Sequence, residues 1–240
     1  KKKTTVTEKT AEALGRKGHD VLAVDTDPNG NLTVNLGYDD RYRDPDVELG
    51  DIILQDGDAQ PGDAIVDTGL GLDLLPAAET METVEKQLQS EGQPSLCMKY
   101  ELVDPLLGDA YDYVLIDTHS SRNMLVSNAT VAAPNLLLPL VPEQGIYSGL
   151  RRTRERVVEP LRERIGLEVL ALVPNKLSQR IDYQTDDRQL IERICTADAL
   201  SERVPNFAWV SPETLRAMDN PDETVSPLPK PGIRKETAVN

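Results

Sequence analysis

Cysteine is one of the scarcest residues in this chain of 240 residues, and the two that occur, Cys97 and Cys195, lie far apart. Neither has a second cysteine or a histidine at the spacing that zinc or iron–sulfur ligands require. We therefore expect both thiols to be reduced and structural.

Long apolar runs are absent as well. No stretch approaches the roughly 20 apolar residues that a membrane-spanning helix needs, and the first residues are polar and lysine-rich, unlike a secretory signal. We therefore expect a cytoplasmic protein. With 39% hydrophobic residues, the chain can build one large core, so we expect a single domain over residues 1–240.

Basic residues are outnumbered by acidic ones, 26 to 41, which gives a formal net charge of −15. The acidic residues are spread over the whole chain, as suits a protein that must stay hydrated in concentrated salt, and this favours a halophilic source. Sequence-independent DNA binding depends on Lys and Arg that neutralise phosphates. Any DNA contact of this chain must therefore be local.

Short apolar segments alternate with amphipathic ones, an order that predicts an α/β fold with a doubly wound, mostly parallel sheet and helices on both faces. A helix is expected at Thr4–Lys17, with Ala11 and Leu14 on its buried face and Gly15 and Gly18 at its end. Strands are expected at Val21–Val24, Leu72–Leu75, Tyr113–Ile116, Leu136–Leu140 and Val169–Val173. Further helices are expected at Met81–Gln89, Leu125–Ala133, Tyr147–Ile165 and Tyr183–Cys195, and surface loops at Asp39–Asp46 and Gln55–Asp63.

A lysine and two hydroxyl side chains, Lys3, Thr4 and Thr5, stand where the first expected helix begins. The first turn of a helix carries unpaired N–H groups and the positive end of the helix dipole, which favour anions. A lysine and a hydroxyl there can meet a phosphate chain and its Mg²⁺. The tripeptide alone is a weak signal, because a solvated helix start with a threonine cap explains it at least as well.

Two carboxylates separated by one residue, Asp25 and Asp27, follow the expected strand Val21–Val24. Ligands of open α/β sheets gather at the carboxyl ends of strands, where these acids can hold a metal or an attacking water. Asp27 could instead cap the turn that follows. Asp25 ends a buried strand, so its carboxylate must be paired or lie near a metal.

A third segment, Tyr111–His119, contains another buried strand that ends in an acid, Asp117. This is the Walker B arrangement, in which the carboxylate holds Mg²⁺, usually through water. Each of the three segments is ambiguous alone. Together they predict one nucleotide site.

On these segments the chain resembles the ParA/MinD/Soj family of deviant Walker A P-loop ATPases, from Lys3 nearly to its last residue. Lys3-Thr4-Thr5 matches the end of the family's loop Lys-Gly-Gly-x-x-Lys-Thr-Thr. The family's Asp-x-Asp-Pro-Gln-Gly-Asn occurs here, with one conservative change, as Asp25-Thr26-Asp27-Pro28-Asn29-Gly30-Asn31. Tyr111–Asp117 matches Tyr-Asp-Tyr-x-x-Ile-Asp, although the family usually continues Pro-Pro where this chain has His119-Ser120.

The resemblance implies ATP and Mg²⁺ as cofactors. Lys3 would bind the β- and γ-phosphates, with Thr5 beside it in the nucleotide site, and Thr4 would hold Mg²⁺. Asp117 would support the metal, and Asp25 would help to anchor the magnesium shell.

Further roles follow from the same resemblance. Asp27 would position the attacking water, and Asn175 would meet the adenine. Val141–Leu150 resembles the segment before the family's long helix, at the dimer face. A second loop lysine, which Lys1 could represent, would reach across a homodimer to the partner's nucleotide.

Basic residues near the end of the chain, Arg180, Arg234 and Lys235, resemble positions that grip DNA without reading its sequence. Solvated surface charges explain them equally well. The resemblance implies a nucleoid-associated partition ATPase with non-specific DNA and a ParB-like adaptor as partners.

Two alternatives stay open. A MinD-like positioning ATPase would carry an amphipathic membrane helix at its carboxyl end, and a hydrolysis-dead scaffold would keep the fold without turnover. A strand and a glycine-rich turn should precede Thr4–Lys17 in this fold, so we expect the sequence to be truncated at both ends.

Overall fold

The computed structural model describes residues 3–38, 46–55, 57–78, 80–120, 123–140, 150 and 152–174. The helices and strands follow the chain as α1 (Lys3–Arg16), β1 (Val21–Asp25), α2 (Asn31–Asn35), α4 (Leu49–Ile53), α5 (Pro61–Ala64), β2 (Val66–Asp67), β3 (Asp73–Leu75), α6 (Met81–Leu88), the π-helical turn η1 (Lys99–Val103), α7 (Asp104–Leu106), β4 (Tyr113–Asp117), α8 (Met124–Ala132), β5 (Asn135–Leu140), the π-helical turn η2 (Arg154–Val158), α10 (Glu159–Ile165) and β6 (Glu168–Pro174).

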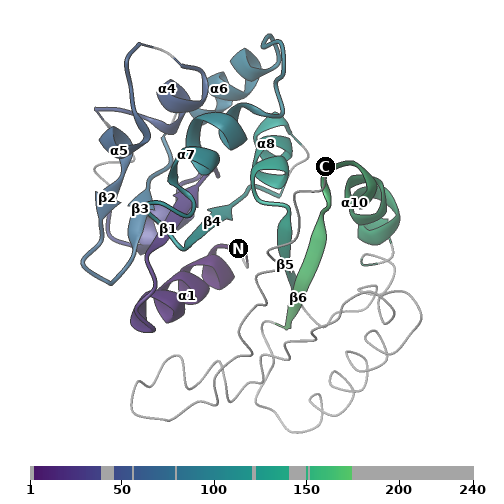
Figure 1. Cartoon of the computed structure of the whole chain (residues 1–240), viewed down its shortest axis with the longest axis horizontal. Helices are drawn as coiled ribbons and strands as arrows, with labels where there is room; N and C mark the ends of the chain where they lie inside the picture. Colours follow the sequence, from purple (N-terminus) through teal and green to yellow (C-terminus); the bar gives the residue numbers. More distant parts are fainter. Residues whose placement is uncertain are drawn as a thin grey trace, which may run out of the picture.

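Three parallel strands form the centre of the fold (Figure 1). Strand β1 lies between β3 and β4 and pairs in parallel with both, while the short β2 adds an antiparallel edge beside β3. Strands β5 and β6 form a second parallel ladder. The expected α/β fold with mostly parallel strands is confirmed, and the five expected strands coincide with β1, β3, β4, β5 and β6 to within one residue at each end.

Helices cover both faces of the central sheet. All five residues of β1 are buried, and the four apolar ones alternate between two hydrophobic clusters. Leu22 and Val24 pack with side chains of α4, α6 and α8, whereas Val21 and Ala23 pack with side chains of α1 and α2. In Figure 1, α1 accordingly lies on one side of β1 and β4, and α4, α6 and α7 lie on the other. A strand that is buried on both sides can be apolar throughout, which is why it was visible in the sequence.

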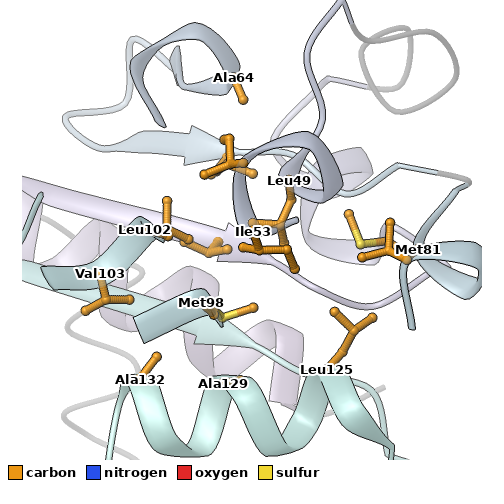
Figure 2. Packing of buried hydrophobic residues seen from close by; sticks show 14 of the residues in the cluster. Leu49, Ile53, Ala64, Met81, Met98, Leu102, Val103, Leu125, Ala129 and Ala132 are labelled. Atoms are coloured by element: carbon orange, nitrogen blue, oxygen red, sulfur yellow. The ribbon is translucent and has the colours of Figure 1, made fainter. Parts of the chain in front are cut away.

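The larger cluster is closed from one side by α8. Figure 2 shows Leu125, Ala129 and Ala132 on the same side of this helix, facing Met98. Leu125 and Met98 are almost fully buried, and the side-chain oxygen of Asn128 accepts a hydrogen bond from the Met98 N–H at 3.0 Å. The spacing of the three α8 residues by four and three positions is the helical period on which its prediction rested.

Helix α1 also connects the central sheet to the second ladder. Val6 packs with Ala171 and Val173 of β6 and with Leu137 of β5. Further along the helix, the buried Ala11 and the partly buried Leu14 join the cluster under β1, as expected from the sequence. Contacts with both ladders therefore fix the position of α1.

The structure differs from the sequence-based expectations in its short elements. Gln55–Asp63 was expected to be a loop throughout, but α5 begins at Pro61, whose fixed φ suits a first helical position. The Gln60 N–H donates to Asp63 Oδ2 at 2.9 Å, which caps this turn. The single turns α4 and η1 were not predicted either.

Parts of other predictions lie outside the described residues: most of the loop Asp39–Asp46, the helix Tyr183–Cys195 and the beginning of the helix Tyr147–Ile165. From Leu150 on, the described residues of that last segment are helical, with η2 as a π-helical turn inside it. In the described part of the chain, no helix combines the length and apolar character that a bilayer crossing requires.

Gly15 allows α1 to approach the loop before β3. A Cβ atom on Gly15 would overlap the carbonyl oxygen of Gly71. We expect Gly15→Ala to destabilise the protein by about 1–3 kcal/mol, because backbone atoms must move. Gly62→Ala in α5 is the matched control: nothing described lies within 4 Å of its added Cβ, so its effect should be neutral or stabilising. Urea unfolding of both variants tests this, and equal stability would contradict the close approach.

Candidate active site

The carboxyl ends of β1 and β4 meet at one edge of the sheet. Asp25, the last residue of β1, is paired in register with Asp117, the last residue of β4. One residue further, the N–H and the hydroxyl of Thr26 both donate to the carbonyl oxygen of Asp117, at 3.0 and 2.7 Å. Thr26 and Asp117 are each 1% exposed. The two strand ends are therefore fixed to each other where open α/β sheets bind ligands.

The first turns of α1 lie against the end of β4. Lys3 Nζ donates to the carbonyl oxygen of His119 at 2.8 Å and to that of Thr118 at 3.4 Å. The Thr7 hydroxyl donates to Asp117 Oδ1 at 3.4 Å. Thr4 is buried, whereas Thr5 is exposed. The expected lysine and one of the two expected hydroxyls thus reach the same edge of the sheet as the acids.

Charges of opposite sign meet at this edge. Burial raises the pKa of Asp117, and the charge of Asp27 adds to this rise, while a hydrogen bond from Thr4, the charge of Lys3 and a hydrogen bond from Thr7 oppose it. Burial lowers the pKa of Lys3, against the attraction of Asp117 and Asp27. Lys3, Asp27 and Asp117 therefore lie within electrostatic reach of one another.

One oxygen of the Asp117 carboxylate has no hydrogen-bond partner among the residues that the structure describes. Oδ2 is buried and accepts no hydrogen bond within the described part of the chain. A buried, unpaired carboxylate oxygen is costly, so native structures retain one mainly where a ligand or ion binds. Beside a buried threonine hydroxyl, this oxygen suits Mg²⁺ or one of its waters, because Mg²⁺ takes oxygen ligands and few protein carboxylates.

Asp25 is fully paired by the protein. Its Oδ2 accepts from the N–H and the hydroxyl of Thr33, both at 2.9 Å, and its Oδ1 accepts from the Asp27 N–H at 3.1 Å. Burial raises the pKa of Asp25 to about 6, although the Thr33 hydrogen bonds oppose the rise. The Thr33 hydroxyl in turn accepts from the Ala77 N–H at 2.9 Å. Asp25 thus joins β1, α2 and the segment after β3, and its expected part in the magnesium shell stays a prediction.

Asp27 caps the turn that follows β1. Its Oδ1 accepts from the N–H of Asn29 at 2.9 Å and from the Asn29 side-chain amide at 2.7 Å. The plainer interpretation of this acid is therefore observed. The role of Asp27 toward an attacking water stays a prediction, compatible with its half-buried position near Lys3 and Asp117.

Several expected site residues lie outside the described part of the chain. They are Lys1, Asn175, Arg180, Arg234 and Lys235, and the same holds for residues 141–149 of the expected dimer segment.

The sequence reasoning missed three threonines, Thr7, Thr26 and Thr33, that hydrogen-bond to the acids. A hydroxyl at the buried end of an apolar strand needs a partner, so Thr26 between two acids was a usable signal. Thr33 gave none, because its partner is eight residues away.

A lysine and a buried threonine at a helix start, beside acids that end two neighbouring parallel strands, define the nucleotide site of a P-loop protein. Residues 2–166 match the family model described as AAA domain. The chromosome partitioning protein ParA of Caulobacter vibrioides is 34% identical over 187 residues, which cover 75% of this chain and 68% of that protein. The chain therefore belongs to the ParA/Soj/MinD family of P-loop ATPases and is an ATP-hydrolysing enzyme.

Solved structures agree with this assignment. A cobyrinic acid a,c-diamide synthase of Mycobacterium smegmatis, with a bound ATP analogue and magnesium, superimposes with a TM-score of 0.68 at 28% identity, covering 82% of this chain and 78% of that one. The cell division ATPase MinD of Pyrococcus furiosus gives a TM-score of 0.59 at 30% identity, covering 79% and 74%.

Thr33 offers a test of the pairing of Asp25. Thr33→Val keeps the shape but leaves the Ala77 N–H without its acceptor, and we expect a loss of about 1–3 kcal/mol in unfolding free energy. The loss should be larger at pH 8 than at pH 5. The pKa of Asp25 lies above its unfolded value of about 4, so ionisation costs stability as pH rises through this window, and the variant lacks the hydroxyl that reduces this cost.

Chemical unfolding at the two pH values measures both effects. Thr83→Val, an exposed position on α6, is the matched control and should change little at either pH. A Thr33→Val loss no greater than the control would contradict the hydrogen-bonded pairing.

Proposed function

We propose that this ATPase acts in DNA partition, as an ATP-dependent dimer that binds DNA without reading its sequence. The convergence of Lys3, Asp27 and Asp117 at one edge of the sheet carries the proposal, because it places a phosphate-binding cation beside two acids. The choice of partition rests on the sequence relatives, such as the partitioning protein ParA of Caulobacter vibrioides. A synthase shares the fold at 28% identity, so the fold alone does not select the function.

The phosphate-binding role falls to the start of α1. In the structure, Lys3 donates to two neutral carbonyl oxygens. Phosphate oxygens are stronger acceptors because hydrogen bonds between charged groups are about twice as strong, so the nucleotide would draw Lys3 to the β- and γ-phosphates. Thr4 would be the hydroxyl ligand of Mg²⁺, and Thr5 would lie at the exposed rim of the nucleotide site.

The metal-binding role falls to Asp117, through Oδ2. Bound Mg²⁺ would supply neutralisation of the charge on the phosphates. Asp25, whose oxygens are both hydrogen-bonded, would contribute by holding the β1–α2 turn and only indirectly through the magnesium shell.

The water-positioning role falls to Asp27. Asn29 fixes Oδ1 with two hydrogen bonds, which orients the carboxylate and would leave Oδ2 to the attacking water. Phosphoryl transfer needs little more than such positioning and charge stabilisation.

Asp27→Ala tests this role. Turnover should fall by about 10²–10⁴, the range for a group that moves or orients a proton, while ATP binding changes little. Asn29→Ala is the control, because it removes the side-chain amide donor of the turn and keeps the carboxylate and the backbone donor. Steady-state hydrolysis and binding of a fluorescent ATP analogue measure both. Unchanged turnover in Asp27→Ala excludes the role, and an equal loss in Asn29→Ala assigns the effect to the turn.

The dimer and its partners rest on the family resemblance. Lys1 would complete the partner's nucleotide site, residues 141–150 would form part of the dimer face, and Asn175 would contact the adenine. A cation supplied across the interface makes hydrolysis depend on dimerisation. A ParB-like adaptor is the expected activator.

DNA binding is assigned to Arg180, Arg234 and Lys235. We expect Arg234→Glu to abolish DNA retention in the ATP state at the salt concentration in which the protein works, because the net charge of −15 leaves few cations to compensate. Arg164→Glu, which makes the same charge change on the exposed side of α10, should retain DNA. Filter binding with ATP tests both, and unchanged retention in Arg234→Glu would place the DNA surface elsewhere.

The MinD-like alternative has support from the Pyrococcus furiosus structure. Flotation of the ATP-bound protein with anionic vesicles discriminates, since a membrane-positioning ATPase floats and a partition ATPase stays with DNA. The alternative of a hydrolysis-dead scaffold disagrees with the family assignment, which makes the chain an ATP-hydrolysing enzyme.

A further inference from the structure

We infer that Thr26 and Thr7 are positioning residues that orient Asp117 so that Oδ2 is the carboxylate oxygen presented to the cation of the bound nucleotide. The inference rests on the proposed function, because it presupposes that Asp117 supports Mg²⁺. It adds two residues of this chain to the site and gives each a separate task.

Thr26 holds the backbone of Asp117. Its N–H and its hydroxyl both donate to the Asp117 carbonyl oxygen, and the hydroxyl contact is the shorter of the two, at 2.7 Å. This carbonyl belongs to the peptide unit that leads from β4 to Thr118. Two donors on one oxygen fix the plane of that unit at the point where sheet pairing ends. The next two carbonyl groups, of Thr118 and His119, are the ones that Lys3 contacts, so the same bonds also set the position of the lysine's partners.

Thr7 holds the side chain of Asp117. It lies three residues after Thr4 and therefore on the same face of α1. Its hydroxyl donates to Oδ1 at 3.4 Å, while Oδ2 is buried without a donor among the described residues. The last torsion of an aspartate is broad and roughly two-fold, so its two oxygens exchange easily unless one is held. Thr4 also donates a hydrogen bond to this carboxylate, and since Oδ2 accepts none from the described residues, Oδ2 is the oxygen available to a cation.

Removal of either hydroxyl should weaken cation binding without removing a metal ligand. Partners that orient a ligand are worth about 10–100-fold in metal affinity, and we expect about tenfold for Thr26→Val and less for Thr7→Val, whose bond is longer. Thr26→Ser and Thr7→Ser keep the hydroxyl and should restore affinity to within about twofold of the original. Thr10→Val, one turn further along α1, is the control and should bind the cation normally.

The experiment measures the dissociation constant of Mn²⁺ for the ADP complex of the full-length protein, by EPR of the free ion. This readout is independent of turnover. Asp117→Asn serves as the reference for complete loss of the carboxylate. Thermal unfolding of each variant is recorded as well, because Thr26 is buried. Thr7 is half-buried, so Thr7→Val tests the inference even if Thr26→Val does not fold.

The outcomes distinguish failure of the positioning role from failure of the proposed metal role of Asp117. Weaker Mn²⁺ binding in the valine variants, with recovery in the serine variants, supports the positioning role. If Asp117→Asn weakens Mn²⁺ binding and the valine variants do not, the positioning role is overturned while the metal role of Asp117 stands. Equal loss in the valine and serine variants would also overturn it, since packing and not the hydroxyl would be the cause. Normal binding in Asp117→Asn would remove the metal role of Asp117, and the inference with it.

Discussion

The register between β1 and β4 is the constraint on which the active site depends. Parallel strands end at the same edge, so the pairing of Asp25 with Asp117 places two acids side by side and sets their distance from α1. Hydrophobic alternation fixes register strongly where only one face is buried. Both faces of β1 are buried here, and a slip of one residue would exchange one apolar core for another. The two hydrogen bonds from Thr26 to the Asp117 carbonyl depend on direction and distance, so they favour the observed register, which the apolar residues alone do not specify.

At the same edge of the sheet, ionisable side chains are buried, which makes their charged forms less favourable. Burial raises the pKa of Asp25 and Asp117 and lowers that of Lys3, so each group is less easily charged than in water. Asp25 is compensated by three donors, whereas one buried oxygen of Asp117 has no donor in the described part of the chain. The fold therefore satisfies the acid that holds its turns together and leaves unsatisfied the acid that is assigned to the ligand. Such an imbalance is typical of binding sites, where stability is lower than it could be.

Much of this arrangement was accessible from the sequence, for identifiable reasons. The strands were visible because burial on both faces makes them continuously apolar, and Asp25 and Asp117 were visible because each interrupts such a run at its end. The single turns α4 and η1 were not, since five residues are too few to show a helical period. Apart from that of Thr26, the contacts of the hydroxyl groups could not be predicted from the sequence either. Thr7 meets an acid 110 residues away, and only the folded chain shows which of its neighbours it reaches.

Charge at the site gives a physical reason for the proposed cation. Lys3 lies within electrostatic reach of the carboxylates of Asp27 and Asp117, and Asp25 lies within reach of Asp117, so a triphosphate would enter a region that is already negative. The positive end of the α1 dipole amounts to only about half a charge. A divalent cation on Asp117, as proposed above, would offset this negative charge where the triphosphate binds. Because the site is buried, dissolved salt screens these interactions far less than it screens a surface contact with DNA. In concentrated salt, nucleotide binding should persist where DNA binding weakens.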